Sequence, residues 1–157
     1  MVGALQESTL LEVKERRIGM STEENKALAR RSWELASQHN PDALEEVYAA
    51  DLVWHEPDQD VQGVEEARQY YSTYLSAFPD LSFTVEDVIA EGDKVVTRWT
   101  VRGTHQGEIE EFGPPTGRQL EQEGITIHRI EDGKIVEEWE RYDLQSFLQQ
   151  LGLVPEQ

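Results

Sequence analysis

The second half of the chain carries four strand-like segments in succession, separated only by turns. Each segment is rich in β-branched and aromatic residues, and the segments span residues 81–90, 95–104, 119–130 and 135–142. The turns lie at Gly92-Asp93, at residues 113–117 and at Asp132-Gly133, all of which are turn-forming combinations. Strands joined by such short turns pair antiparallel, because a parallel pair needs a crossover of about a dozen residues or more. This half therefore predicts an antiparallel sheet.

Helical patterns precede the sheet. Apolar residues recur near helical spacing over residues 28–36, 43–48 and 64–78, a brief strand is expected over 51–56, and a last short helix over 143–151. The pattern Ser21-Thr22-Glu23-Glu24 is typical of a helix start. We therefore expect residues 1–19 to be an N-terminal extension and residues 20–157 to be one α+β domain.

Charge and composition exclude several classes of function. The chain has 14 basic and 32 acidic residues, a formal net charge of −18. That excess repels nucleic acid and anionic membranes alike. There is no cysteine and no apolar run of the roughly 20 residues that a membrane span needs. We therefore expect a cytoplasmic protein that binds neither nucleic acid nor membrane.

The Asp132-Gly133 turn predicts which residues of its two strands share a face. A regular two-residue hairpin pairs Ile130 with Ile135, His128 with Glu137 and Thr126 with Trp139. With strict alternation, Trp139, Arg141 and Asp143 then lie on the face of His128. The pattern predicts that the side chains of His128, Trp139 and Asp143 point into the same space.

Asp143 and His128 are therefore the first candidates for catalysis. A desolvated carboxyl at Asp143 would act as general acid/base, and His128 would orient or polarise the substrate. The structural alternative is that Asp143 caps the following helix and that His128 is a hydrogen-bonded strand residue.

Further candidates for the substrate site lie elsewhere in the chain. Trp54-His55-Glu56-Pro57 ends the brief strand, where only one of His55 and Glu56 can face a pocket and Trp54 can belong to the core. Tyr74 belongs to an aromatic stripe that either packs the helix on the sheet or contacts substrate, and His105 lies in a loop that either covers the pocket or is exposed. Phosphate loops, nucleophile elbows and zinc motifs are absent from the sequence, and we expect no metal.

Several short sequence motifs, in this order and spacing, resemble those of the SnoaL-like polyketide cyclases, or ester cyclases, of the nuclear-transport-factor-2-like (NTF2-like) superfamily. They lie at residues 52–57, 78–81, 103–105, 114–117, 132–139 and 150–152. The resemblance implies a cone in which N-terminal helices wrap a curved antiparallel sheet around a pocket. It also implies cofactor-free intramolecular aldol condensation of a small carbonyl compound, with the family's pocket Asp matching Asp143 and its pocket His matching His128.

The resemblance also implies alternatives. Ketosteroid isomerases of the same superfamily place a base near the end of the first strand, where Glu56 stands. Epoxide hydrolases use an Asp-Arg-Asp set, for which Arg98, Arg141 and Asp143 are available, and a non-catalytic carrier of an apolar molecule would use the same pocket. We expect a homodimer that forms through the outer face of the sheet.

Overall fold

The computed structural model describes residues 21–155, so the expected extension lies outside the described residues. Residues 21–37 are helical. They are followed by η1 (Pro41–Glu46), β1 (Tyr48–His55), β2 (Asp60–Gln62), α2 (Gly63–Ala77), β3 (Ser82–Glu91), β4 (Lys94–Thr104), β5 (Gln119–Glu131), β6 (Lys134–Tyr142) and α3 (Leu144–Gln150). The α+β class is confirmed.

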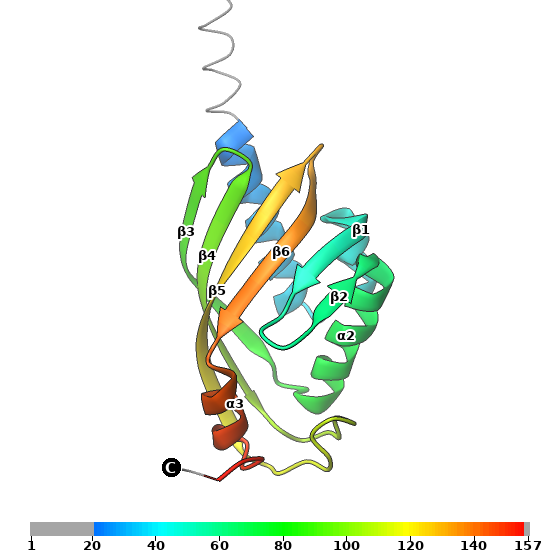
Figure 1. Ribbon diagram of the computed structural model, residues 1–157, viewed down its shortest axis with the longest axis vertical. Helices are drawn as coiled ribbons and strands as arrows, with labels where there is room; N and C mark the ends of the chain where they lie inside the picture. The colour runs from blue at the N-terminus through cyan, green and yellow to red at the C-terminus, as the bar shows by residue number, and fades with distance from the viewer. Residues whose placement is uncertain (1–20, 156–157) are drawn as a thin grey trace, which may run out of the picture.

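The six strands form one twisted sheet in the order β2-β1-β6-β5-β4-β3 (Figure 1). Strands β3 to β6 are an antiparallel meander, as their turns predict, and β1 pairs parallel with β6 at the other side. The parallel pair is possible because α2 and four further strands separate β1 from β6 in the sequence.

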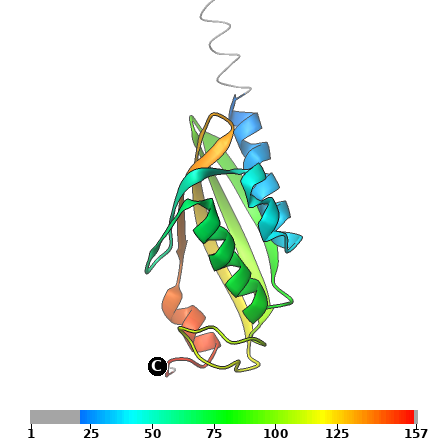
Figure 2. The ribbon, with the colours of Figure 1, turned by 90° about the vertical axis from the view of Figure 1, so that its right-hand side faces the viewer.

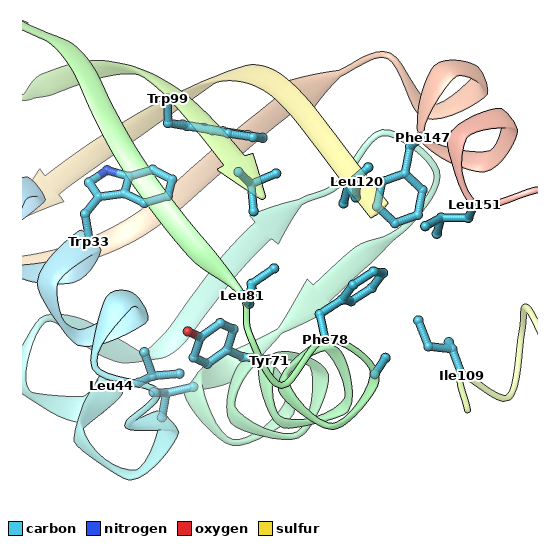
Figure 3. Packing of buried hydrophobic residues seen from close by; sticks show 13 residues of the cluster. Trp33, Leu44, Tyr71, Phe78, Leu81, Trp99, Ile109, Leu120, Phe147 and Leu151 are labelled. Atoms are coloured by element: carbon cyan, nitrogen blue, oxygen red, sulfur yellow. The ribbon is translucent and has the colours of Figure 1, made fainter. Parts of the chain in front are cut away.

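Both long helices lie on one face of the sheet (Figure 2). The helix of residues 21–37 buries Ala29, Trp33 and Leu35, and α2 buries Val64, Ala67 and Tyr71. Figure 3 shows Trp33 beside Trp99 of the sheet, and Tyr71 with its hydroxyl directed towards the helix of residues 21–37, where it donates to the Ala36 carbonyl. The concave face thus carries the hydrophobic core, and no helix of residues 21–155 covers the opposite face.

Two elements differ from the sequence-based expectation. Residues 41–46 form a 3-10 helix, so the short helix expected over 43–48 is present but begins and ends two residues earlier. Val47 leads into β1, and the Ile135 amide donates to the Val47 carbonyl at 2.8 Å. The three-residue strand β2 was not predicted, since Asp60–Gln62 is too short to show a period-2 pattern.

A β-bulge in β6 changes the face of every residue that follows it. Ile130 pairs with Ile135, but Arg129 pairs with Glu137, so Val136 has no opposite residue on β5. His128 consequently pairs with Glu138 and Thr126 pairs with Glu140. The predicted pairs His128 with Glu137 and Thr126 with Trp139 are wrong by one residue, and the predicted shared face of His128 and Asp143 is wrong with them.

Gly124 in the middle of β5 allows an aromatic ring to lie against the strand backbone. A Cβ atom at this position would come within 2.2 Å of Cζ2 of Trp99, its cross-strand neighbour on β4. We expect Gly124→Ala to lower the free energy of unfolding by about 1–3 kcal/mol, because the indole has to move within a packed core. Urea unfolding tests this, with Glu123→Ala on the exposed side of the same strand as control; equal midpoints for Gly124→Ala and wild type would contradict it.

Candidate active site

The concave face of the sheet and the two long helices enclose a cavity of about 120 Å³. An engineered cavity of similar size holds one benzene ring. Its walls are mostly aromatic and aliphatic, with residues from the helix of residues 21–37, α2 and strands β1, β3, β4, β5 and β6. The side chains with polar groups that line it, besides the indoles of Trp33, Trp54 and Trp99, are Ser32, Tyr48, Glu56, Tyr70, Tyr71, Tyr74, Gln122, Glu138, Glu140 and Tyr142.

Glu56 and Glu140 form a pair of directly interacting carboxyl groups in this cavity. Glu56 follows β1 and is 6% exposed, and Glu140 projects from β6 beside it. Burial raises the pKa of Glu56, and the charge of Glu138 raises it further. Burial also raises the pKa of Glu140 well above its usual value, reinforced by the charge of Glu56 and the hydrogen bond between them. Both carboxyls therefore bind a proton more tightly than an ordinary glutamate does, and they titrate as a pair.

Glu138 is held by two hydrogen bonds deeper in the same wall. Its Oε2 atom accepts from the Tyr48 hydroxyl at 2.8 Å and lies 3.0 Å from Nε2 of His128. Glu138 and His128 are 2% and 1% exposed. These partners satisfy the buried Glu138 carboxyl and hold it close to the Glu56/Glu140 pair.

A chain of neutral donors orients the carboxyl pair. The indole Nε1 of Trp99 donates to Thr126 Oγ1 at 2.8 Å, and that hydroxyl donates to Glu140 Oε1 at 3.3 Å. The Tyr142 hydroxyl donates to Glu56 Oε2 at 3.3 Å. Burial raises the pKa of the Tyr142 hydroxyl, which therefore stays protonated and remains a donor.

Tyr70 and Tyr74 add two hydroxyl groups to the α2 side of the cavity. The Tyr70 hydroxyl donates to that of Tyr74 at 3.4 Å, and the two rings lie 5.0 Å apart. Burial raises the pKa of both hydroxyls. The predicted cavity position of Tyr74 is where the structure places it, and its neighbour Trp54 meets Tyr70 edge to face at 5.2 Å.

Asp143 and His128, the first sequence candidates, lie outside the cavity lining. Asp143 is exposed and caps α3, with its Oδ1 accepting from the Ser146 amide at 2.9 Å. His128 is on the inner face of the sheet, where it contacts Glu138 but does not itself line the cavity. The bulge at Val136 is the reason that the two do not meet.

His55 and Trp139 lie on the outer face of the sheet. Their rings stack at 5.6 Å, and His55 bridges Asp60 at 2.8 Å and Glu137 at 2.7 Å. The hydrogen bond to Glu137 raises the pKa of His55. Of the adjacent pair His55 and Glu56, Glu56 is therefore the one that faces the cavity.

His105 holds the loop that connects β4 to β5. Its Nδ1 atom accepts from the Thr116 amide at 3.3 Å, and its backbone pairs with Arg118 and Gly117. The ring is fully buried against Phe78 at 5.5 Å and is not part of the cavity lining. The loop and α3 together cover the lower end of the sheet in Figure 1.

Sequence reasoning missed Glu138, Glu140, Tyr48 and Tyr142 as cavity residues. The period-2 pattern of β6 contains a charged residue on either face, so alternation alone does not distinguish them. Nothing in the local sequence marks Val136 as a bulge. Within residues 21–155 no cluster of three or more acidic or histidine side chains is placed to hold a metal ion, and no helix is long and apolar enough to cross a membrane.

Comparison with known proteins places these features in a family. The model of the SnoaL-like polyketide cyclase family matches residues 26–151. No curated protein matches the chain. A candidate SnoaL-like polyketide cyclase from Jannaschia sp. CCS1 has a similar structure, with a TM-score of 0.77 at 24% identity, over 85% of this chain and 95% of that one.

Two further solved structures share more of the sequence. AclR, a candidate hydroxylase from Streptomyces galilaeus, is 30% identical with a TM-score of 0.75, over 85% of this chain and 99% of that one. IdmH, a candidate polyketide cyclase from Streptomyces antibioticus, is 31% identical with a TM-score of 0.69, over 82% and 98% of the two chains.

Proposed function

Since the chain belongs to the SnoaL-like polyketide cyclase family, we propose that it is a cofactor-independent acid/base enzyme that forms an enolate from a small carbonyl compound and closes a ring by intramolecular aldol condensation. The observation that carries this proposal is the Glu56/Glu140 pair, whose pKa values burial raises in an otherwise aromatic cavity. A carboxylate and a carboxylic acid side by side supply a base and an acid at the same pH.

In this mechanism Glu56 is the base. Its ionised carboxylate removes a proton from the carbon next to the carbonyl, and Glu140, which keeps its proton, donates a hydrogen bond to the developing enolate oxygen. The enolate carbon then attacks a second carbonyl of the same molecule. The alkoxide formed takes a proton from the pair, which returns to one shared proton.

The neighbouring groups keep the pair in this state. Glu138, fixed by Tyr48 and His128, places a negative charge near both carboxyls and favours retention of the shared proton. Tyr142 orients Glu56 and the Trp99–Thr126 chain orients Glu140. In this proposal Glu56 and Glu140 take the roles first expected of Asp143 and His128. His128 is a positioning residue for Glu138.

The indole N–H of Trp54 is placed to donate a hydrogen bond to a carbonyl ligand. It lines the cavity, and its buried indole N–H has no hydrogen-bond partner among residues 21–155. A carbonyl oxygen of the substrate would supply an acceptor, and an unpaired buried donor is costly otherwise. A carrier of apolar molecules would need the cavity but neither the carboxyl pair nor this donor. Turnover of small carbonyl compounds, compared between wild type and Glu56→Gln, separates the two functions.

The outer face of the sheet is our proposed dimer interface. Two large apolar residues are exposed there, Ile89 at 65% and Ile125 at 45%, beside ion pairs such as Arg98 with Asp87. We expect sedimentation at 0.15 M salt to show a species of twice 18.0 kDa, and Ile125→Asp to convert it to monomer. Gln69→Asp on exposed α2 is the control, and a wild-type monomer throughout would refute the interface.

A further inference from the structure

The cavity wall contains acids but no bases. Glu56, Glu138 and Glu140 line it, whereas no Lys, Arg or His among residues 21–155 does so. Elsewhere in this part of the chain carboxylates are commonly paired with arginine, as in Asp87 with Arg98. The charge of the cavity is therefore not balanced by its own lining.

One negative charge of the cavity lining, that of the Glu56/Glu140 pair, has no partner of opposite charge. In the proposed mechanism Glu56 and Glu140 share a single proton and so carry one negative charge between them. Glu138 has its own partners, the Tyr48 hydroxyl and the His128 ring. The charge on the pair stays in an apolar enclosure without a counter-ion, an arrangement that is unfavourable until a cation arrives.

The other walls are suited to a cation. Trp33, Trp54, Trp99, Tyr70 and Tyr74 line the same cavity from several sides. Aromatic faces attract cations through their quadrupole, and rings that surround a space recognise organic ammonium groups in this way. A hydrated metal ion does not match such walls, whereas an organic cation buries its carbon skeleton against them.

We propose that the substrate carries a protonated amine, which lies against the Glu56/Glu140 pair inside the aromatic walls. The inference rests on the proposed function and names the substrate class of the same site: a carbonyl compound with a basic nitrogen. An ammonium group near the carbonyl also acidifies the adjacent C–H bond and balances the enolate charge, so binding and proton removal by Glu56 are favoured together. A substrate with a free carboxylate is excluded by repulsion.

Three probes of similar size and different charge test this: 2-phenylethylamine, 2-phenylethanol and phenylacetate. Their dissociation constants are measured by calorimetry at pH 7 and fixed ionic strength. We expect the amine to bind at least about tenfold more tightly than the alcohol, and phenylacetate to show no measurable binding. In the double variant Glu56→Gln/Glu140→Gln, which removes the negative charge of the pair, the amine preference should fall severalfold or more, while affinity for the alcohol, which reports an intact cavity, changes little. Glu140→Gln alone leaves that charge on Glu56 and should keep most of the preference.

Glu123→Gln is the matched control, because it removes one negative charge from the exposed face of β5. If Glu123→Gln reduces the amine preference as much as the double variant does, the preference comes from the overall charge and the proposal fails. It also fails if the alcohol binds wild type as tightly as the amine. If wild type shows no amine preference but still turns over neutral carbonyl compounds, this inference alone is overturned. If the amine binds as expected but Glu56→Gln keeps full turnover, only the mechanism is overturned.

Discussion

Glu56→Gln and Glu140→Gln should each lower kcat on a turned-over carbonyl substrate by about 10²–10⁴-fold, the usual contribution of a positioned acid/base group. Glutamine has nearly the same shape as glutamate and can still hydrogen-bond, but it neither accepts nor releases the proton. Asp143→Asn should retain the wild-type rate, since asparagine is an equally good helix cap and Asp143 lies outside the cavity lining.

The pH dependence of kcat gives an independent measurement. The reaction needs one carboxyl ionised and one protonated, so the rate should fall at low pH, where both are protonated. Because burial raises the pKa of Glu140 well above its usual value, the acid persists to a higher pH than an ordinary glutamate would allow and is lost as pH rises through that raised value. In Glu140→Gln the alkaline fall should disappear while the acidic fall, due to Glu56, remains. A full rate in both glutamine variants together with a large loss in Asp143→Asn would return the acid/base role to Asp143.

Trp99→Ala should be among the most destabilising single changes, at about 3–5 kcal/mol in the free energy of unfolding. Trp99 is 3% exposed, and its ring lies 5.9 Å from that of Trp33 and 6.3 Å from that of Phe83. Truncation removes these contacts, enlarges the cavity and leaves Thr126 without its donor.

Trp139→Ala is the matched control for this change. Trp139 is half-buried on the outer face of the same sheet and stacks only on His55, so the loss should be about 1 kcal/mol or less. Urea unfolding of both variants measures the difference, and the melting temperature should drop by roughly 2–4 °C for each kcal/mol. Equal losses for the two tryptophans would show that the cavity wall adds little to stability.

The sequence predicts most of the fold because its signals are local. Turn residues at Asp132-Gly133, segments rich in β-branched and aromatic residues, and the strand end at Pro57 all act over a few residues. The elements they delimit are found within about one to three residues of the expected bounds. Strand β2 and the parallel pairing of β1 with β6 depend on contacts between distant segments. Local patterns do not encode those contacts.

The candidate site was predictable only in part, for the same reason. The sequence offers Glu56 and Trp54 by their position at a strand end and Tyr74 by its aromatic stripe, each with a structural alternative, and all three line the cavity. Glu138 and Glu140 were assigned to the wrong face, because a single unpaired residue in β6 reverses the alternation and no local preference specifies it.

The bulge at Val136 also decides how relatives of this protein should be aligned. In a relative whose last strand lacks the extra residue, the pocket residues align with Glu138, Glu140 and Tyr142 only when a one-residue gap is placed opposite Val136. An ungapped alignment would match the pocket acids of that relative to Glu137, Trp139 or Arg141, which here face away from the cavity. Catalytic residues copied across the family by column would then be assigned to the wrong side of the sheet, even where the sequences are similar enough to align without ambiguity elsewhere.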